Sequence, residues 1–206
     1  MPKGPPDRKR LDCTDRMARH LTVSALAATV VVMLSIASLA QAPPNPPMVL
    51  TSSSFPDGGV IPDKYTANGA HPGSFALSWE NAPPGTLSFT LIMHDLDTLP
   101  RKTGPDNLHW MLINIPASVH ALPEGVPADA TLPDGTIQPV TQAGRAIGFL
   151  PPGAPPGPYH HYLIELYALD TKLKVDPAAI PVRSEILSQM EGHVIGKAFY
   201  VGRFHK

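Results

Sequence analysis

Proline is the feature that most restricts how this chain can fold: 26 of its 206 residues are proline and another 16 are glycine. Proline has no backbone N–H group, so it interrupts helices and is excluded from central strands. Hydrophobic residues make up 43% of the chain, which is enough to build a core, so extensive disorder is not expected. The composition therefore predicts one domain of short strands and ordered loops, with little helix.

The first 40 residues have the layout of a secretory signal peptide. Six basic residues lie within the first 20 positions, an uncharged apolar run follows at 21–39, and the small residues Ser38 and Ala40 precede a cleavage site. Cleavage after Ala40 leaves Gln41 first, whereas cleavage after Ala42 would place Pro43 next to the scissile bond. The alternative is an uncleaved anchor, because the apolar run approaches the roughly 20 residues that span a bilayer. We predict a signal peptide at 1–40 and an exported protein, periplasmic or secreted, with N-terminal membrane anchoring as the alternative.

The rest of the chain divides into a Pro-rich linker at 41–47 and a domain at 48–206. With the leader removed, it contains 10 Lys and Arg and 14 Asp and Glu, so its net charge is −4, against −1 for the whole chain. This balance offers no basic surface for nucleic acid or for anionic lipid. The only cysteine, Cys13, lies in the leader, so we expect no disulfide framework.

Strands are predicted wherever β-branched and apolar residues form short runs between turn signals. Five such runs occur, at 75–79, 88–94, 109–115, 162–169 and 198–204. One amphipathic helix is predicted at 182–190, with Val182, Ile186, Leu187 and Met190 on one face and Gly192 at its end. Strands at this spacing without helical periodicity between them favour an all-β sandwich or open sheets.

Three stretches carry candidate chemistry, and each also has a purely structural interpretation. Asp95 and Asp97 follow an apolar strand and would share a face if the strand stays regular, or they are the solvated end of that strand. His109 begins another strand beside Trp110, either in a site or as a hydrogen-bonded interior histidine. The Pro-rich loop at 148–161 ends in His160, His161 and Tyr162 and is either a rigid pocket wall or a surface loop. Familiar signatures of hydrolases, zinc proteases and P-loops do not occur in the sequence.

Taken in order, these motifs resemble the phosphatidylethanolamine-binding family in its bacterial, Raf-kinase-inhibitor-like branch. The resemblance runs from about Leu50 to Phe204. Its motifs are the opening LTSSSF at 50–55, the L-x-W and P-x-G-T stretches at 77–86, D-L-D-T at 95–98, HWMLINIP at 109–116, and P-P followed by H-H-Y at 155–162. The family implies a mainly β fold: a large antiparallel sheet packed with a smaller one, and one or two short peripheral helices.

The resemblance also implies a small anion pocket at one end of the sheet. Its walls, carried over by motif, would be Asp95, Asp97, His109, Pro155, Pro156, His160 and Tyr162. His109, His160 and Tyr162 would donate to a phosphate or carboxylate, Asp97 would orient a histidine, and Asp95 or Asp97 would accept from an ethanolamine ammonium. This chain departs from the family in three places: Leu96 replaces a proline, His161 replaces an arginine, and Gly157 directly follows the Pro-Pro pair.

The leading interpretation is an exported protein that binds a small anionic or zwitterionic ligand, such as phosphate or a phosphoethanolamine-like head group. On this interpretation we expect no catalytic activity, no metal or other cofactor, no nucleic-acid partner and no membrane span once the leader is removed. One alternative is inhibition of a protease or another protein partner, as yet unknown, through the loop at 123–144. Another is a metal- or water-dependent hydrolase that uses the Asp/His cluster. We expect ligand binding to strengthen as His109 and His160 become protonated near pH 6.5.

Overall fold

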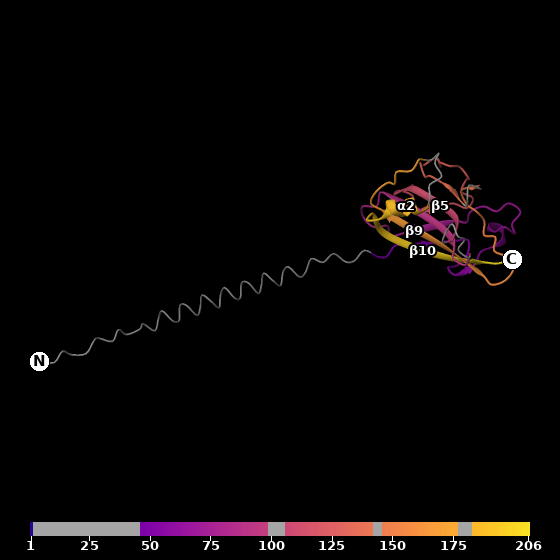
Figure 1. Cartoon of the computed structure of the whole chain (residues 1–206), viewed down its shortest axis with the longest axis horizontal. Helices are drawn as coiled ribbons and strands as arrows, with labels where there is room; N and C mark the ends of the chain where they lie inside the picture. Colours follow the sequence, from indigo (N-terminus) through magenta and orange to yellow (C-terminus); the bar gives the residue numbers. More distant parts are fainter. Residues whose placement is uncertain (2–45, 99–105, 142–145, 177–182) are drawn as a thin grey trace. The chain divides into compact units, whose positions relative to one another are not determined.

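The large sheet contains the strands that the sequence predicts most clearly. The computed structural model describes Met1 and residues 46–98, 106–141, 146–176 and 183–206; the rest of the leader lies outside these residues. The order in the sheet is β2-β10-β9-β4-β5, formed by Gly59–Val60, Val194–Phe204, His160–Leu169, Ser88–Asp95 and Asn107–Pro116. Figure 1 labels three of these strands, β5, β9 and β10. The four long strands pair antiparallel, whereas the short β2 pairs parallel with β10.

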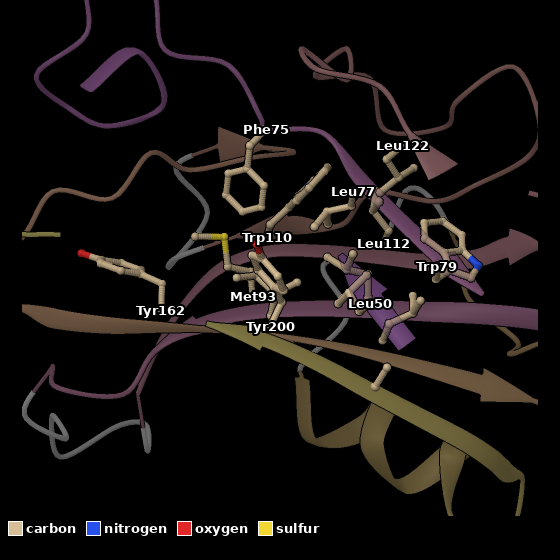
Figure 2. Close-up of a cluster of buried hydrophobic side chains, with 14 of the residues drawn as sticks. Leu50, Phe75, Leu77, Trp79, Met93, Trp110, Leu112, Leu122, Tyr162 and Tyr200 are labelled. Atoms are coloured by element: carbon tan, nitrogen blue, oxygen red, sulfur yellow. The ribbon is translucent and has the colours of Figure 1, made fainter. Parts of the chain in front are cut away.

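The smaller sheet packs its apolar residues against one face of the large sheet. Its order is β1-β3-β6, formed by Val49–Thr51, Leu77–Glu80 and Ala121–Leu122. Leu50, Leu77 and Trp79 join Met93 and Trp110 in one buried cluster (Figure 2). This arrangement confirms the prediction of a mainly β fold with a large sheet packed on a smaller one. A third sheet pairs β7 (Val140–Thr141) with β8 (Ala146–Ile147), and a 3-10 helix, η1, spans Asp63–Tyr65.

The opposite face of the large sheet is covered in part by α2, Arg183–Met190. Ile186 and Met190 are buried there against Ile92 of β4, because residues four positions apart share a helix face. Leu187, predicted on the same face, is instead 37% exposed, and Val182 lies outside the described residues. Since β4 has cover on both faces, it is buried along its whole length, which explains why apolar residues follow one another directly at 91–93. Of the described helices, none has the length and apolar content that a membrane crossing requires.

A β-bulge in β5 determines where His109 points. Leu108 pairs with His94 and Trp110 pairs with Met93, which leaves His109 as the extra residue between two paired positions. Strict alternation would place His109 on the face opposite to Trp110. The bulge turns it instead toward the ring of Tyr162, which belongs to the same buried cluster as Trp110.

Candidate functional site

Asp95, the last residue of β4, is the centre of the candidate site and is only 3% exposed. The backbone N–H groups of Asp97 and Thr98 donate to its Oδ1 at 2.9 and 3.2 Å. The hydroxyl of Thr98 and Nδ1 of His160 donate to its Oδ2, both at 2.8 Å. A carboxylate has about four acceptor positions, so the Asp95 carboxylate is fully used in forming the 95–98 turn and orienting His160.

His109 lies beside Tyr162 and is held by the loop that precedes β9. Its Nδ1 donates to the carbonyl of Leu150 at 2.9 Å, and the Leu150 N–H donates back to the His109 carbonyl at 2.7 Å. Its ring stands nearly perpendicular to that of Tyr162, with the centroids 5.0 Å apart. Burial lowers the pKa of His109, which is 4% exposed, and this outweighs the opposing effects of the Leu150 carbonyl and the Asp95 charge. The pKa of His109 therefore lies below the value near 6.5 on which the expected pH dependence of ligand binding rests.

Tyr162 is fully buried and lies at one end of the cluster in Figure 2, with its hydroxyl pointing away from the other labelled side chains. Within the described residues the hydroxyl has no hydrogen bond of normal length, although the Asp95 side chain lies close enough to raise its pKa by hydrogen bonding. Burial, followed by the negative charge of Asp95, raises the pKa of Tyr162, so its O–H group stays protonated. The amides of Gly153 and Ala154 lie close enough to act on this pKa in the opposite direction. This end of the cluster therefore presents a buried donor.

The two adjacent histidines of β9 bind different carboxylates. His160, with 19% of its side chain exposed, bonds Asp95, whereas His161 donates both its backbone N–H and its Nδ1 to Asp97 at 2.6 and 2.8 Å. β4 ends at Asp95, so Asp97 lies in a bend and the argument that both aspartates share a strand face does not apply to it. The Asp97 and His161 side chains are 42% and 47% exposed. The structure thus brings Asp95, His109, His160 and Tyr162 together and places Asp97 at the surface beside them.

Pro155 and Pro156 are exposed, and within the described residues no hydrogen bond or ring contact links them to the histidines. The part of the loop next to the site is the preceding stretch, 150–154, through the Leu150 carbonyl and the amides near Tyr162. The sequence analysis did not find this stretch, because backbone groups act there and leave no side-chain signal. Asn107, which donates to the Thr98 hydroxyl at 3.2 Å, was also missed.

A second polar cluster, which the sequence analysis also missed, lies on the opposite face of the large sheet. His94 is 6% exposed and bonds Asp106 through Nδ1 at 2.5 Å and Glu165 through Nε2 at 3.2 Å. Arg183, the first residue of α2, donates to Asp106, and Lys197 pairs with Glu165 at 2.6 Å. This network ties the beginning of α2 to the sheet. Across the described part of the chain, no three His, Cys, Asp or Glu residues are grouped so as to hold a metal ion.

Comparison with known proteins decides the family. The family model described as phosphatidylethanolamine-binding protein matches residues 51–205. The chain belongs to the phosphatidylethanolamine-binding protein family. A relative from Methanothermobacter thermautotrophicus, known as a UPF0098 protein, is 38% identical over 159 residues, which cover 77% of this chain and 99% of the relative. The UPF0098 protein YbhB of Escherichia coli is 33% identical over 138 residues, covering 64% of this chain and 85% of YbhB.

Solved structures of the same family share the fold. A homologue of the phosphatidylethanolamine-binding proteins from Chlamydia trachomatis superposes with a TM-score of 0.67 at 32% identity, covering 78% of this chain and 98% of the homologue. YbcL of Escherichia coli, described as a new member of the mammalian family, gives a TM-score of 0.65 at 27% identity, covering 78% of this chain and 99% of YbcL. The resemblance inferred from the sequence motifs is therefore confirmed.

Proposed function

We propose that this family member is an exported protein that binds a small phosphate-containing head group, such as phosphoethanolamine, between His109, His160 and Tyr162. The proposal is supported by a set of polar atoms around Asp95 that make no hydrogen bond to the described part of the protein. The Tyr162 hydroxyl and the Nε2 atoms of both histidines have no hydrogen-bond partner within the described residues. The Tyr162 hydroxyl is also buried, and a buried polar group without a partner costs free energy, so a ligand that pairs with this hydroxyl gains what the free protein lacks.

The ammonium of a zwitterionic ligand would bind Asp97 rather than Asp95. All the acceptor positions of Asp95 are taken by donors of the protein itself. Asp97 uses only Oδ2 for His161, and its Oδ1 has no partner within the described residues. Although partial burial opposes it, hydrogen bonding from His161 lowers the pKa of Asp97, which favours the ionised carboxylate that an ammonium needs.

A calorimetric titration tests this function directly. The full chain is expressed, purified and titrated with phosphoethanolamine, beside the variants His109→Ala and His193→Ala. His193 is a control histidine away from the site, because its Nδ1 bonds Asp170 at 2.8 Å, and Asp170 directly follows the end of β9 opposite to His160. We expect saturable binding in the wild type and in His193→Ala, and loss of binding in His109→Ala. Absence of heat with phosphoethanolamine, phosphate and acetate would overturn the proposal and favour a protein partner.

A further inference from the structure

Arg183, the first residue of α2, binds the carboxylate of Asp106 on the face of the large sheet that α2 covers. Arg183 donates through Nη1 to Oδ1, and the other oxygen, Oδ2, lies 2.5 Å from Nδ1 of His94. The side chains of Asp106 and Arg183 are only 15% and 20% exposed, so solvent screens this ion pair less than it screens a pair at the surface. Asp106 is therefore held on both oxygens, by β4 through His94 and by α2 through Arg183.

This contact lies one residue away from the candidate site on each of two paired strands. Asp106 directly precedes Asn107, the first residue of β5, and His94 directly precedes Asp95, the last residue of β4. Asp95 and Asn107 pair across the two strands. Because successive side chains point to opposite faces of a sheet, His94 and Asp106 lie on the α2 face, whereas Asp95 and Asn107 lie on the face of the site.

The Asn107 side chain connects the two faces through hydrogen bonds. Its Nδ2 donates to the Thr98 hydroxyl at 3.2 Å, and this hydroxyl donates to Oδ2 of Asp95 at 2.8 Å. The Thr98 hydroxyl has one hydrogen, which goes to Asp95, so it can only accept from Asn107. Hydrogen bonds in such a series strengthen one another. Oδ2 of Asp95 also accepts from Nδ1 of His160, so the position of Asn107 affects the ring of a ligand-binding histidine.

We infer that Arg183 is a positioning residue for the candidate site and acts on it from the opposite face of the sheet. By binding Asp106, it holds Asn107 in place. Asn107 in turn holds the Thr98 hydroxyl and, through it, the Asp95 carboxylate. This inference rests on the proposed function, because it concerns what controls ligand affinity at that site. Attachment of α2 and occupation of the site are coupled, so a change that loosens the beginning of α2 weakens binding.

A double-mutant cycle tests this route. The full chain is titrated calorimetrically with phosphoethanolamine, beside Arg183→Met, Thr98→Val and the variant with both substitutions. We expect Arg183→Met to weaken binding about three- to tenfold, a size typical of residues that act on a site without touching its ligand. In the Thr98→Val background the same substitution should change the affinity by less than about twofold, because the bond through which Arg183 acts is already missing.

Two further variants of α2 separate this route from a general loss of helix stability. Arg183→Lys keeps a cation beside Asp106 but loses the guanidinium fork, so it should recover part of the affinity and replaces Arg183→Met in the cycle if that variant does not fold. Glu185→Gln removes a negative charge from the first turn of α2, which weakens the helix through its dipole and leaves the Arg183 contact in place. We expect the affinity of Glu185→Gln to equal that of the wild type.

Hydrogen exchange gives a second readout, because coupling between two sites is reciprocal. If Arg183 strengthens ligand binding, then the ligand must strengthen the attachment of α2. We expect saturating phosphoethanolamine to slow amide exchange at residues 183–190 in the wild type, and to have no such effect in Thr98→Val.

The outcomes distinguish the coupling from the function on which it rests. An equal loss of affinity from Arg183→Met with and without Thr98, or no loss in either background, overturns the inference and leaves ligand binding intact. A loss in Glu185→Gln as large as that in Arg183→Met also overturns it, since helix stability alone would then control the affinity. Exchange in α2 that does not respond to the ligand has the same meaning. Failure of the wild type to bind phosphoethanolamine removes the proposed function itself, and the inference with it.

Discussion

Asp95 and His160 lie 65 positions apart in the sequence and are joined by a 2.8 Å hydrogen bond between Oδ2 and Nδ1. The bond links the end of β4 to the beginning of β9, two strands that pair directly in the sheet. It fixes which nitrogen of His160 faces the protein and which faces outward. The contacts of Asp95 therefore connect the stability of this end of the sheet with the geometry of the proposed binding site.

Replacing Asp95 with asparagine should lower the stability of the fold and also weaken phosphate binding. The new side chain has an NH₂ group where Asp95 has one of its two carboxylate oxygens. If the NH₂ replaces Oδ2, the Thr98 hydroxyl and His160 lose their acceptor; if it replaces Oδ1, the backbone amides of residues 97–98 lose theirs. We expect a loss of about 1.5–3 kcal/mol in the free energy of unfolding and at least tenfold weaker phosphate binding. Urea denaturation and calorimetry measure the two effects. Asp170→Asn alters an exposed Asp–His pair and should cost under about 1 kcal/mol; equal losses in both variants would contradict the role given to Asp95.

Glu165 should make stability depend on pH in the acid range. Although burial opposes it, hydrogen bonds from His94 and Lys197 lower the pKa of Glu165 to about 2, and only 10% of its side chain is exposed. A carboxyl whose pKa is lower in the folded chain than in the unfolded one stabilises the fold above about pH 4.5, and this contribution disappears as the pH falls toward 2. The size is on the order of 3 kcal/mol. Urea midpoints at several pH values should show that Glu165→Gln loses less stability than the wild type as the pH falls. The same dependence on pH in both proteins would contradict the pairing of Glu165 with His94 and Lys197.

His109 should affect the stability of the fold over a higher pH range than Glu165 does. Burial lowers its pKa in the folded chain, while the unfolded chain takes up a proton near pH 6.5. The unfolded state therefore binds more protons below pH 6.5, so this residue makes the fold less stable as the pH falls from there to the pKa of folded His109. The difference in unfolding free energy between wild type and His109→Asn should change across pH 5–7 with this sign. A difference that does not change with pH would mean that His109 titrates normally in the fold.

Gln138 is expected to be one of the most sensitive polar positions away from the site. It is 2% exposed, accepts from the Trp110 indole at 2.9 Å and donates to the carbonyls of Pro127 and Asp129 at 2.6 and 2.9 Å. Gln138→Leu leaves the buried Trp110 indole N–H and two part-buried carbonyls unpaired and should cost about 2–3 kcal/mol. Gln189→Leu, which removes a single exposed bond from the Lys174 amide, should cost under about 1 kcal/mol. Thermal unfolding compares the two variants, and similar changes in Tm would show that Gln138 does not anchor the stretch at 127–129.

The proposed export predicts a processed N-terminus. Expression of the full chain in a Gram-negative host, followed by fractionation and mass spectrometry, should recover a periplasmic protein that begins at Gln41, because small residues at Ser38 and Ala40 precede that bond. Leu39→Arg, which puts a charge between them, should cause the precursor to accumulate. Intact chain in the membrane fraction would favour the anchor, and intact chain in the cytoplasm would remove the export proposal.

The sequence determined the class of fold and the approximate positions of its strands. Prolines and glycines excluded long helices, and the apolar runs marked the four long strands to within a few residues of their ends, except that β10 begins four residues before its predicted start. These signals are local, because proline geometry and side-chain alternation act over a few neighbouring residues. The motifs around Asp95, His109 and His160 identified the family for the same reason, since each is a short contiguous stretch.

The tertiary structure alone decided how these residues meet. The orientation of His109 depends on a bulge, which is a property of the register between β4 and β5 and not of either strand by itself. Asp97 binds His161 because β4 ends two residues earlier, and Leu150 fixes the tautomer of His109 through a carbonyl that every residue possesses. The network around His94 joins side chains from distant strands and from α2. Such contacts form only when the chain closes on itself, so no local pattern could reveal them.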